Sequence, residues 1–324
     1  MNEARVEPAT RESPAEPESL KEQLSYGAFA TAERLAMILP EFIGRRVFDL
    51  GALAAFHVAP KARAVVQDNL SRVLGKPSGS PLVRAAARES FRSYGRYWYD
   101  TFHVRTMPDD EFMRRYRYVG QEHIARALEA GGGAVIAVPH LGNWDGAGKW
   151  VHLTGWRITA VAERLRPRRL YELFFEHRRA LGMGIVGLED DRRAGERLVQ
   201  LMKENEVIAL VADRDLRGDG VVVEMFGQER RMPPGPAMLS LITGSPLLPA
   251  ACYDQADGWV TYIDPPLEIE RTGRLRDDVT ALTRLLAKRF ERAIAAAPTQ
   301  WHMFQPAWDG TGFEAPTGAG PDAT

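Results

Sequence analysis

The sequence predicts an α/β fold, in which a central, mainly parallel sheet is flanked by helices and preceded by an N-terminal helical layer. Between Leu20 and Val104, apolar residues recur at spacings of three and four, which is typical of helices, and no convincing strand interrupts them. After Met107, short apolar runs alternate with helical segments. This alternation indicates βαβ units and a parallel sheet that is covered on both faces.

The segments of this fold can be placed in order along the chain. Pro40 and Pro60 divide the helical layer. Apolar runs predict strands at 134–138, 157–162, 184–187, 207–211, 221–225, 247–252 and 259–263. Helical spacing predicts helices from Gln121 to the glycines at 131–133, from about Asn143, and over 168–181, 192–204 and 276–296. The ends are rich in Pro, Gly, Ala and acids. We therefore expect disordered tails at 1–19 and 309–324 and one domain over 20–308, made of the helical layer (20–106) and an α/β catalytic core (107–308).

Composition excludes several classes of protein. The net charge of −1 gives no overall basic field, so a nucleic acid partner is not expected. Cys252 is the single cysteine, which rules out a disulfide within the chain. No apolar run approaches the roughly 20 residues that span a bilayer, so we expect any membrane contact to be peripheral. Arginines crowd residues 164–197, either as a solvated helical face or as an anion-binding surface.

The strand predicted at 134–138 leads directly to a candidate catalytic histidine. His140 follows the carboxyl end of this strand, where sites gather in open α/β sheets. Asp145 lies near enough along the next helix to accept a hydrogen bond from the imidazole, and this would orient a general base. Gly142 would let the backbone approach a substrate, and helix-start amides could stabilise an oxyanion. The alternative is a loop histidine that caps the helix.

Two later segments could join this site. Asp213-Arg214-Asp215 follows the strand at 207–211 and emerges at the same edge of the sheet. Either aspartate could support the base, or both could bond local backbone in a turn. Phe226-Gly227 and residues 232–237 frame a rigid loop that opens a helix, with amides able to face an anion or a carbonyl.

Other common catalytic devices are missing from the sequence. There is no G-x-S-x-G nucleophile elbow, and no dinucleotide or P-loop motif in a strand–helix setting. Cys252 falls within a predicted strand and is expected in the core. His140, Asp145, Asp213 and Asp215 could in principle bind a metal, but no paired-histidine spacing supports this, and no metal is expected.

The residues from His140 to Asp145 match the H-x4-D signature of the lysophospholipid acyltransferase superfamily. Within it, the chain resembles bacterial lipid A acyltransferases and, most of all, actinobacterial phosphatidylinositol mannoside acyltransferases. The resemblance runs in order over about residues 30–308. It depends on the blocks PHLGNWD (139–145), RRALGM (178–183), ADRDL (212–216), FG (226–227), RMPPGPA (231–237) and WHMFQP (301–306).

This resemblance implies both a reaction and a location. The donor would be palmitoyl-CoA or a similar acyl-CoA, which is a substrate, so that no cofactor is needed. The acceptor would be a mannose hydroxyl of a phosphatidylinositol mannoside, and a hydrophobic groove would hold the acyl chain. The protein would be attached peripherally to the inner, cytoplasmic face of the plasma membrane.

The resemblance also assigns roles to residues. His140 would be the general base, and Asp145 would orient it or line the acceptor site. Asp213, at a position where the family often has glutamate, would pair with His140, and Arg178 would lie beside the acceptor. The further residues expected to bind substrate are Gly142, Asn143, Arg214, Asp215, Phe226, Gly227, Pro233 and Gly235.

These roles lead to a mechanistic hypothesis and its rivals. The thioester would lie in a groove walled by the N-terminal helices, with the arginines binding CoA phosphates or anionic head groups. Four aromatic side chains would dip into the bilayer or, alternatively, pack in the core; they are Tyr26, Phe29, Phe42 and Phe48. The alternative functions are lipid A secondary acylation, non-catalytic lipid binding and metal-dependent hydrolysis.

Overall fold

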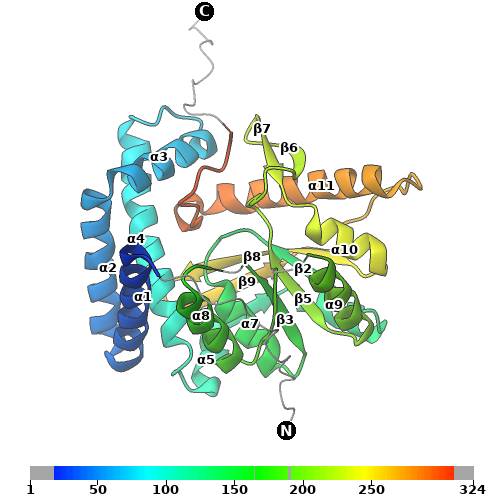
Figure 1. Cartoon of the computed structure of the whole chain (residues 1–324), viewed down its shortest axis with the longest axis horizontal. Coiled ribbons are helices and arrows are strands. Elements are labelled where there is room, and N and C mark those ends of the chain that lie inside the picture. The colour runs from blue at the N-terminus through cyan, green and yellow to red at the C-terminus, as the bar shows by residue number, and fades with distance from the viewer. Residues whose placement is uncertain (1–17, 164, 189–190, 310–324) are drawn as a thin grey trace, which may run out of the picture.

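Four helices form the N-terminal layer of the computed structural model, which describes residues 18–163, 165–188 and 191–309 (Figure 1). They are α1 (Leu20–Ile38), α2 (Glu41–Val58), α3 (Pro60–Leu74) and α4 (Pro81–His103). Pro40 caps α2 and Pro60 is the first residue of α3. Proline suits these positions because it lacks the N–H that a first helical turn leaves unbonded. The predicted helical layer is therefore confirmed.

A seven-stranded sheet forms the centre of the described chain, in the order β1-β9-β8-β2-β5-β3-β4. Its strands are β1 (Tyr116–Val119), β2 (Ala134–Val138), β3 (Ile158–Ala162), β4 (Gly184–Gly187), β5 (Val207–Val211), β8 (Leu247–Gln255) and β9 (Gly258–Ile263). All neighbours are parallel except β8 and β9. Those two strands are joined by a tight turn, which permits only antiparallel pairing. The predicted α/β fold with a mainly parallel sheet is confirmed.

Helices cover both faces of this sheet (Figure 1). Every residue of β2 is buried, and alternate side chains enter the two cores. One face packs against α5 (Asp109–Arg115), α6 (Gln121–Glu129) and α7 (Trp144–Leu153). The other packs against α9 (Asp191–Lys203), α10 (Gly235–Thr243) and α11 (Leu275–Ala296). The β2–α7 junction, which carries His140, is thus held between two packed layers.

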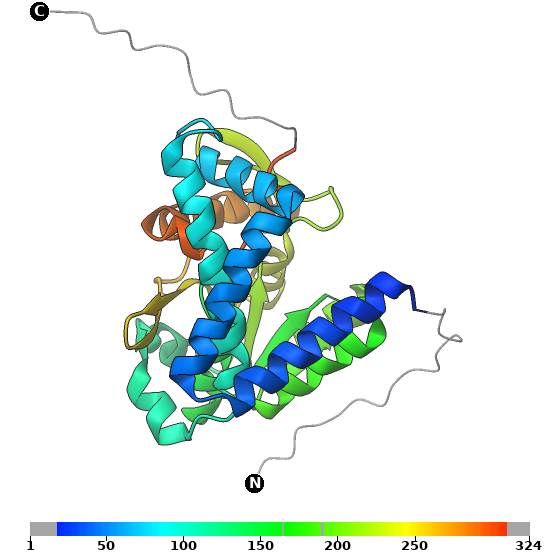
Figure 2. The same cartoon turned by 90° about the vertical axis from the view of Figure 1, so that its left-hand side faces the viewer.

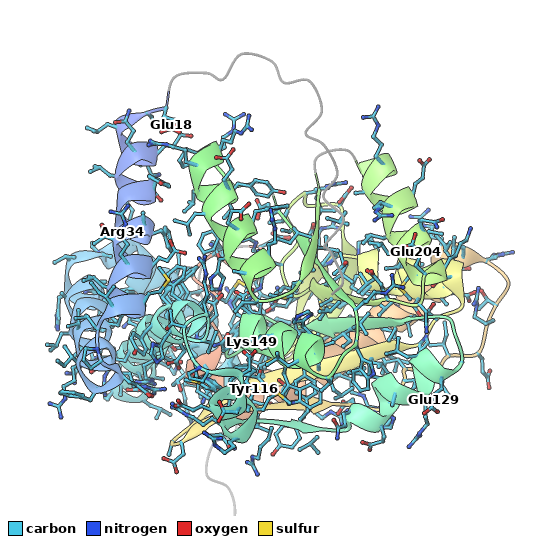
Figure 3. All side chains as sticks on the ribbon, turned by 90° about the horizontal axis from the view of Figure 1, so that it is seen from below. Glu18, Arg34, Tyr116, Glu129, Lys149 and Glu204 are labelled. Carbon is cyan, nitrogen blue, oxygen red and sulfur yellow. The ribbon has the colours of Figure 1, made fainter. Side chains whose placement is uncertain are left out.

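The N-terminal layer reaches the core through α4 and α8 (Arg168–Ala180). Helices α1 and α8 lie side by side, with Phe29 on Phe174 and Arg169 paired with Glu18 (Figures 2 and 3). At the other end, buried Lys149 of α7 donates to the carbonyl of Val104 at 2.9 Å, just beyond α4. The layer is therefore anchored on both α7 and α8.

Two parts of the fold differ from the predictions. Helix α5 and strand β1 were not predicted, because β1 has only four residues and includes Arg117. The strand β7 (Gln228–Met232) was also missed, because its sequence QERRM is polar. It pairs with β6 (Val221–Met225) as an antiparallel hairpin whose turn, Phe226-Gly227, has φ of 53° and 71°. The predicted rigid loop therefore contains a strand.

The tails predicted at 1–19 and 309–324 fall almost wholly outside the described residues, and the division into one domain with two parts stays a prediction. Across the described ranges, no helix has the length and apolar character needed to cross a bilayer. Tyr26, Phe29 and Phe48 pack in a cluster with α4 and α8, whereas Phe42 is 70% exposed.

Candidate active site

The sheet brings His140 and Asp213 together. Strands β2 and β5 are parallel neighbours in which Val138 lies opposite Val211. His140 and Asp213 each lie two positions after the last residue of their strand. His140 Nδ1 lies 2.5 Å from Asp213 Oδ1. The backbone N–H of His140 also donates to Asp213 Oδ2 at 3.1 Å. The carboxylate thus holds both the ring and the backbone of the histidine.

Asp213 is fully buried yet strongly acidic. Burial by itself raises the pKa of a carboxyl, but the charge of His140 and hydrogen bonds from His140 and Trp301 outweigh it. Arg230, whose guanidinium donates to the Asp213 carbonyl, adds to the effect. Together they lower the pKa of Asp213 to about 2. Asp213 is therefore a carboxylate at neutral pH.

Asp145 has a different partner from the one expected. It is buried on the first turn of α7, where Arg178 Nε donates to its Oδ1 at 2.7 Å and Tyr97 donates weakly to Oδ2 at 3.5 Å. Burial disfavours the Arg178 guanidinium, but the charge of Asp145 outweighs it and raises the pKa of Arg178. Among the described residues, the expected hydrogen bond from the imidazole to Asp145 is not formed; Asp145 is paired with Arg178, and His140 Nδ1 is bonded to Asp213.

An apolar cavity reaches the Asp145–Arg178 pair. It encloses about 560 Å³, part of it open to solvent, along the sheet face beneath α7. Its walls are Tyr118, Ile136, Val138, Trp144, Asp145, Ala147, Gly148, Ile158, Ala160, Val161, Arg178, Met183, Ala209, Leu210, Val211, Ala250 and Thr261. Trp144, one of these walls, also packs against His140, with the two ring centroids 5.6 Å apart. None of these walls comes from the N-terminal helices, so the cavity is not the groove that we expected there.

Gly142 has a packing role, and the substrate role expected of it stays a prediction. Its φ is +60°, and an added Cβ would lie 2.3 Å from the carbonyl oxygen of Cys252 in β8. Its backbone N–H is bonded to the carbonyl of Gln300. Asn143 is the N-cap of α7, and its side chain accepts from the Gly146 N–H at 2.9 Å. Both residues shape the catalytic loop from within the fold.

The remaining predicted site residues contact other parts of the molecule. Arg214 pairs with Glu163. Asp215 accepts from three backbone amides, which is the turn alternative considered above; they belong to Arg217, Gly218 and Gly220. The Phe226 N–H donates to Glu291 of α11. Gly227 completes the β6–β7 turn, Pro233 lies between β7 and α10, and Gly235 begins α10. Within the described ranges, none of these six residues forms a hydrogen bond or an ion pair with His140, Asp145 or Asp213.

The C-terminal segment is the part of the site that we did not anticipate. Trp301 Nε1 donates to Asp213 Oδ2 at 2.7 Å, and the His302 N–H donates to the His140 carbonyl at 2.7 Å. Burial, with the charges of His140 and Arg96, lowers the pKa of His302 to about 3, so its ring is neutral. The only signal in the sequence was the block WHMFQP, which carried no recognisable chemistry.

Two arginines of the arginine-rich stretch are paired with acids of their own helix. Arg168 pairs with Glu172, and Arg179 pairs with Glu176. Arg164 lies outside the described residues, so an anion-binding role of the whole stretch stays a prediction. In the part of the chain that the structure covers, no three His, Cys, Asp or Glu side chains form a group that could hold a metal ion.

A partly exposed histidine paired with a buried aspartate, at the carboxyl edge of a parallel sheet, suits proton transfer from a hydroxyl group. The chain belongs to the bacterial lipid A biosynthesis acyltransferase family, whose model matches residues 20–309. It is therefore an acyltransferase.

Relatives with more specific names support this membership. A phosphatidylinositol mannoside acyltransferase of Mycobacterium tuberculosis (strain CDC 1551 / Oshkosh) is 41% identical over 288 residues, which cover 87% of each chain. Another, from Mycolicibacterium smegmatis, is 40% identical over 285 residues, covering 86% of this chain and 90% of the relative. The resemblance identified from the sequence is confirmed.

Proposed function

We propose that the protein transfers a long acyl chain, palmitoyl in the first instance, from acyl-CoA to a mannose hydroxyl of a phosphatidylinositol mannoside, with His140 as the general base. The observation that carries the chemistry is the 2.5 Å hydrogen bond between His140 Nδ1 and Asp213 Oδ1. The names of the relatives support the acceptor. The family match keeps a lipid A precursor as the second candidate acceptor.

The reaction uses the free ring nitrogen of His140. Its Nε2 has no hydrogen-bond partner among the described residues, and 23% of the side chain is exposed. Nε2 takes the proton of the acceptor hydroxyl as the hydroxyl oxygen attacks the thioester carbonyl carbon. The C–S bond then breaks, an ester forms, and the imidazolium returns the proton to the leaving thiolate to give free CoA. Asp213 stabilises the transient imidazolium.

The start of α7 is suited to the oxyanion of this reaction. No acceptor within the described residues bonds the backbone amides of Asn143, Trp144 and Asp145. Unbonded amides at a helix N-terminus carry a partial positive charge. Donors aimed at a developing oxyanion commonly contribute roughly 3–4 kcal/mol to such reactions. We assign the thioester carbonyl to this helix start.

We assign the acyl chain to the apolar cavity and the sugar of the acceptor to the Asp145–Arg178 ion pair. The cavity, lined by aliphatic side chains of β2, β3 and β5, takes the acyl chain. Arg178 and Asp145 provide polar groups for the sugar of the acceptor. No step uses a metal or a cofactor, so activity should survive a chelator.

The peripheral membrane contact is assigned to α1 and α2. Large apolar side chains lie exposed along both helices; they are Leu20, Leu24, Ile38, Phe42, Ile43, Val47, Leu50 and Val58. The acids Glu33, Glu41 and Asp49 pair with arginines outside α1 and α2. Exposed Arg34 and Arg46 have no acid partner within the described residues. Apolar and cationic groups together suit an anionic leaflet.

A sedimentation assay tests this surface. The protein should sediment with vesicles that contain anionic phospholipid, and Leu50→Asp should weaken this binding. Ile242→Asp on α10, where Ile242 is also half exposed, is the control and should bind as the parent does. If both variants bind the vesicles equally, the assignment of α2 to the membrane contact is wrong.

The test of the function is release of CoA from palmitoyl-CoA with purified phosphatidylinositol mannoside as acceptor. We expect acceptor-dependent release by the parent and a loss of roughly 10²- to 10⁴-fold in His140→Ala. His123→Ala on α6, whose ring makes no contact with the site, is the matched control and should retain activity. Release with a lipid A precursor instead would reassign the acceptor. Full activity of His140→Ala would refute the assigned base.

A further inference from the structure

The segment 300–303 is tied to the catalytic loop by backbone hydrogen bonds. The Gly142 N–H donates to the Gln300 carbonyl at 3.2 Å, and the His302 N–H donates to the His140 carbonyl at 2.7 Å. Leu141 and Trp301 form an antiparallel bridge between these two bonds. The segment therefore lies antiparallel to the loop that carries the base, joined to it at one isolated bridge, and we refer to it as the C-terminal strap.

The strap is anchored at both ends. The Gln300 side chain exchanges two hydrogen bonds with the backbone of Asp254 in β8, at 2.8 and 3.1 Å. At the other end, the buried Asn69 of α3 donates to the carbonyls of Met303 and Gln305 at 3.0 and 2.9 Å. These anchors fix the direction in which the Trp301 side chain points.

The Trp301 indole reaches the carboxylate that supports the base. Trp301 is 3% exposed, and its Nε1 lies 2.7 Å from Asp213 Oδ2. Oδ2 also accepts the backbone N–H of His140. An indole and a backbone amide can only donate, so Oδ2 can only accept from them. Oδ1 is then the atom left for the ring of His140.

This pattern fixes the tautomer of the histidine. Asp213 is an acceptor at both oxygens because it is a carboxylate, as its lowered pKa also indicates. The short contact to Oδ1 therefore requires the proton on Nδ1 of neutral His140. The lone pair is left on Nε2, which is the atom that faces the substrate in the proposed function.

We propose that Trp301 is a positioning residue for the acyl transfer: its indole N–H holds Asp213 in the orientation that keeps the Nδ1–H tautomer of His140 and leaves Nε2 as the base. This inference rests on the proposed function. It adds to it a residue 88 positions from Asp213, which reaches the site only through the strap.

Trp308 provides a matched control. It is buried at 4% exposure in the same core cluster, and the two indole rings lie 6.0 Å apart. Its Nε1, however, has no hydrogen-bond partner in the described part of the chain. Trp301→Phe and Trp308→Phe therefore remove similar apolar volume, but only the first removes a hydrogen bond to Asp213.

The experiment compares these two variants in the full-length protein. We expect Trp301→Phe to lower kcat by roughly 10- to 100-fold, the usual range for a hydrogen bond to a charged group, with KM for acyl-CoA within about twofold. Trp308→Phe should keep the parent kcat at a temperature where both are folded. If both variants lose kcat in step with their stability, Trp301 has a structural role only and the proposal fails.

A second readout does not depend on activity. The proton between Nδ1 and Oδ1 should give a downfield proton NMR resonance that His140→Ala abolishes. Trp301→Phe should shift or broaden it, and Trp308→Phe should leave it in place. An unchanged resonance in Trp301→Phe would overturn the proposal even if the acceptor were misassigned. If Trp301→Phe does not fold, benzothienylalanine at position 301 replaces the N–H by sulfur and preserves the ring shape.

Discussion

Two buried aspartates, one at the edge of β5 and one in β8, behave in opposite ways. Asp213 lies at the site with its carboxyl fully buried, and its pKa is lowered to about 2. Asp254 lies in the β8–β9 hairpin with both carboxyl oxygens buried. Burial and the charge of nearby Asp100 raise the pKa of Asp254 to about 7. Similar burial thus accompanies opposite shifts.

The difference comes from hydrogen-bond donors. Asp213 accepts from the ring and backbone of His140 and from the indole of Trp301. Neither carboxyl oxygen of Asp254 has a hydrogen-bond partner in the described part of the protein. Burial disfavours the charged form of both carboxyls, and only Asp213 has hydrogen-bond donors that offset this cost. A buried carboxylate that supports a catalytic base therefore needs hydrogen-bond donors around it to stay charged.

The largest effect is expected from removing the charge of Asp213. In Asp213→Asn the amide still occupies the space, but it no longer stabilises an imidazolium on His140. We expect kcat to fall by roughly 10²- to 10⁴-fold in the CoA-release assay. Asp254→Asn, which changes a carboxyl outside the site, should stay within about twofold of the parent. Equal losses in the two variants would contradict the comparison.

Asp145 provides a third case, since a single arginine accounts for its strongest hydrogen bond. Arg178→Met leaves Asp145 buried without its cation, and we expect a loss of about 2–3 kcal/mol in the free energy of unfolding. KM for the glycolipid should rise more than kcat falls. Arg179→Met is the control, because Arg179 is exposed and pairs only loosely with Glu176 at 3.6 Å. Urea unfolding and steady-state kinetics measure both, and identical behaviour of the two variants would count against a role for the buried pair.

The smallest effect concerns Asp254 and depends on pH. Its pKa is about 7 in the folded state and 3.8 as a free side chain. The folded chain thus holds this proton more tightly, and the parent loses stability as pH rises from about 4 to 7. Asp254→Asn lacks this titration, so its stability relative to the parent should rise over that range and level off above pH 7. Unfolding measured at pH 5, 6, 7 and 8 checks this; a constant difference would mean that Asp254 is ionised throughout.

Much of the fold was predictable from the sequence, for a physical reason. The strands β2, β4, β5 and β6 have the predicted bounds, because each is a short apolar or β-branched run limited by turn residues. The strand β7 was missed because one of its buried residues, Arg230, is charged and because its pairing depends on the hairpin turn. Local pattern therefore identified the buried strands and failed at the polar hairpin.

The site was predictable only as far as the sheet determines it. The positions of His140 and Asp213 follow from the rule that parallel strands present their carboxyl ends at one edge. The partner of Asp145 and the role of Trp301 depend on packing between segments 33 and 88 positions apart. No spacing in the sequence encodes such contacts.

The central claim, that His140 and Asp213 act as one unit, is tested most directly by a double-mutant cycle on CoA release. The rates of the parent, His140→Ala, Asp213→Asn and the double variant are compared at one pH, with folding checked by urea unfolding. We predict that Asp213→Asn causes little further loss once His140 is replaced, because the carboxylate acts through the imidazole. Losses that multiply in the double variant would contradict the claim and assign the two residues independent roles.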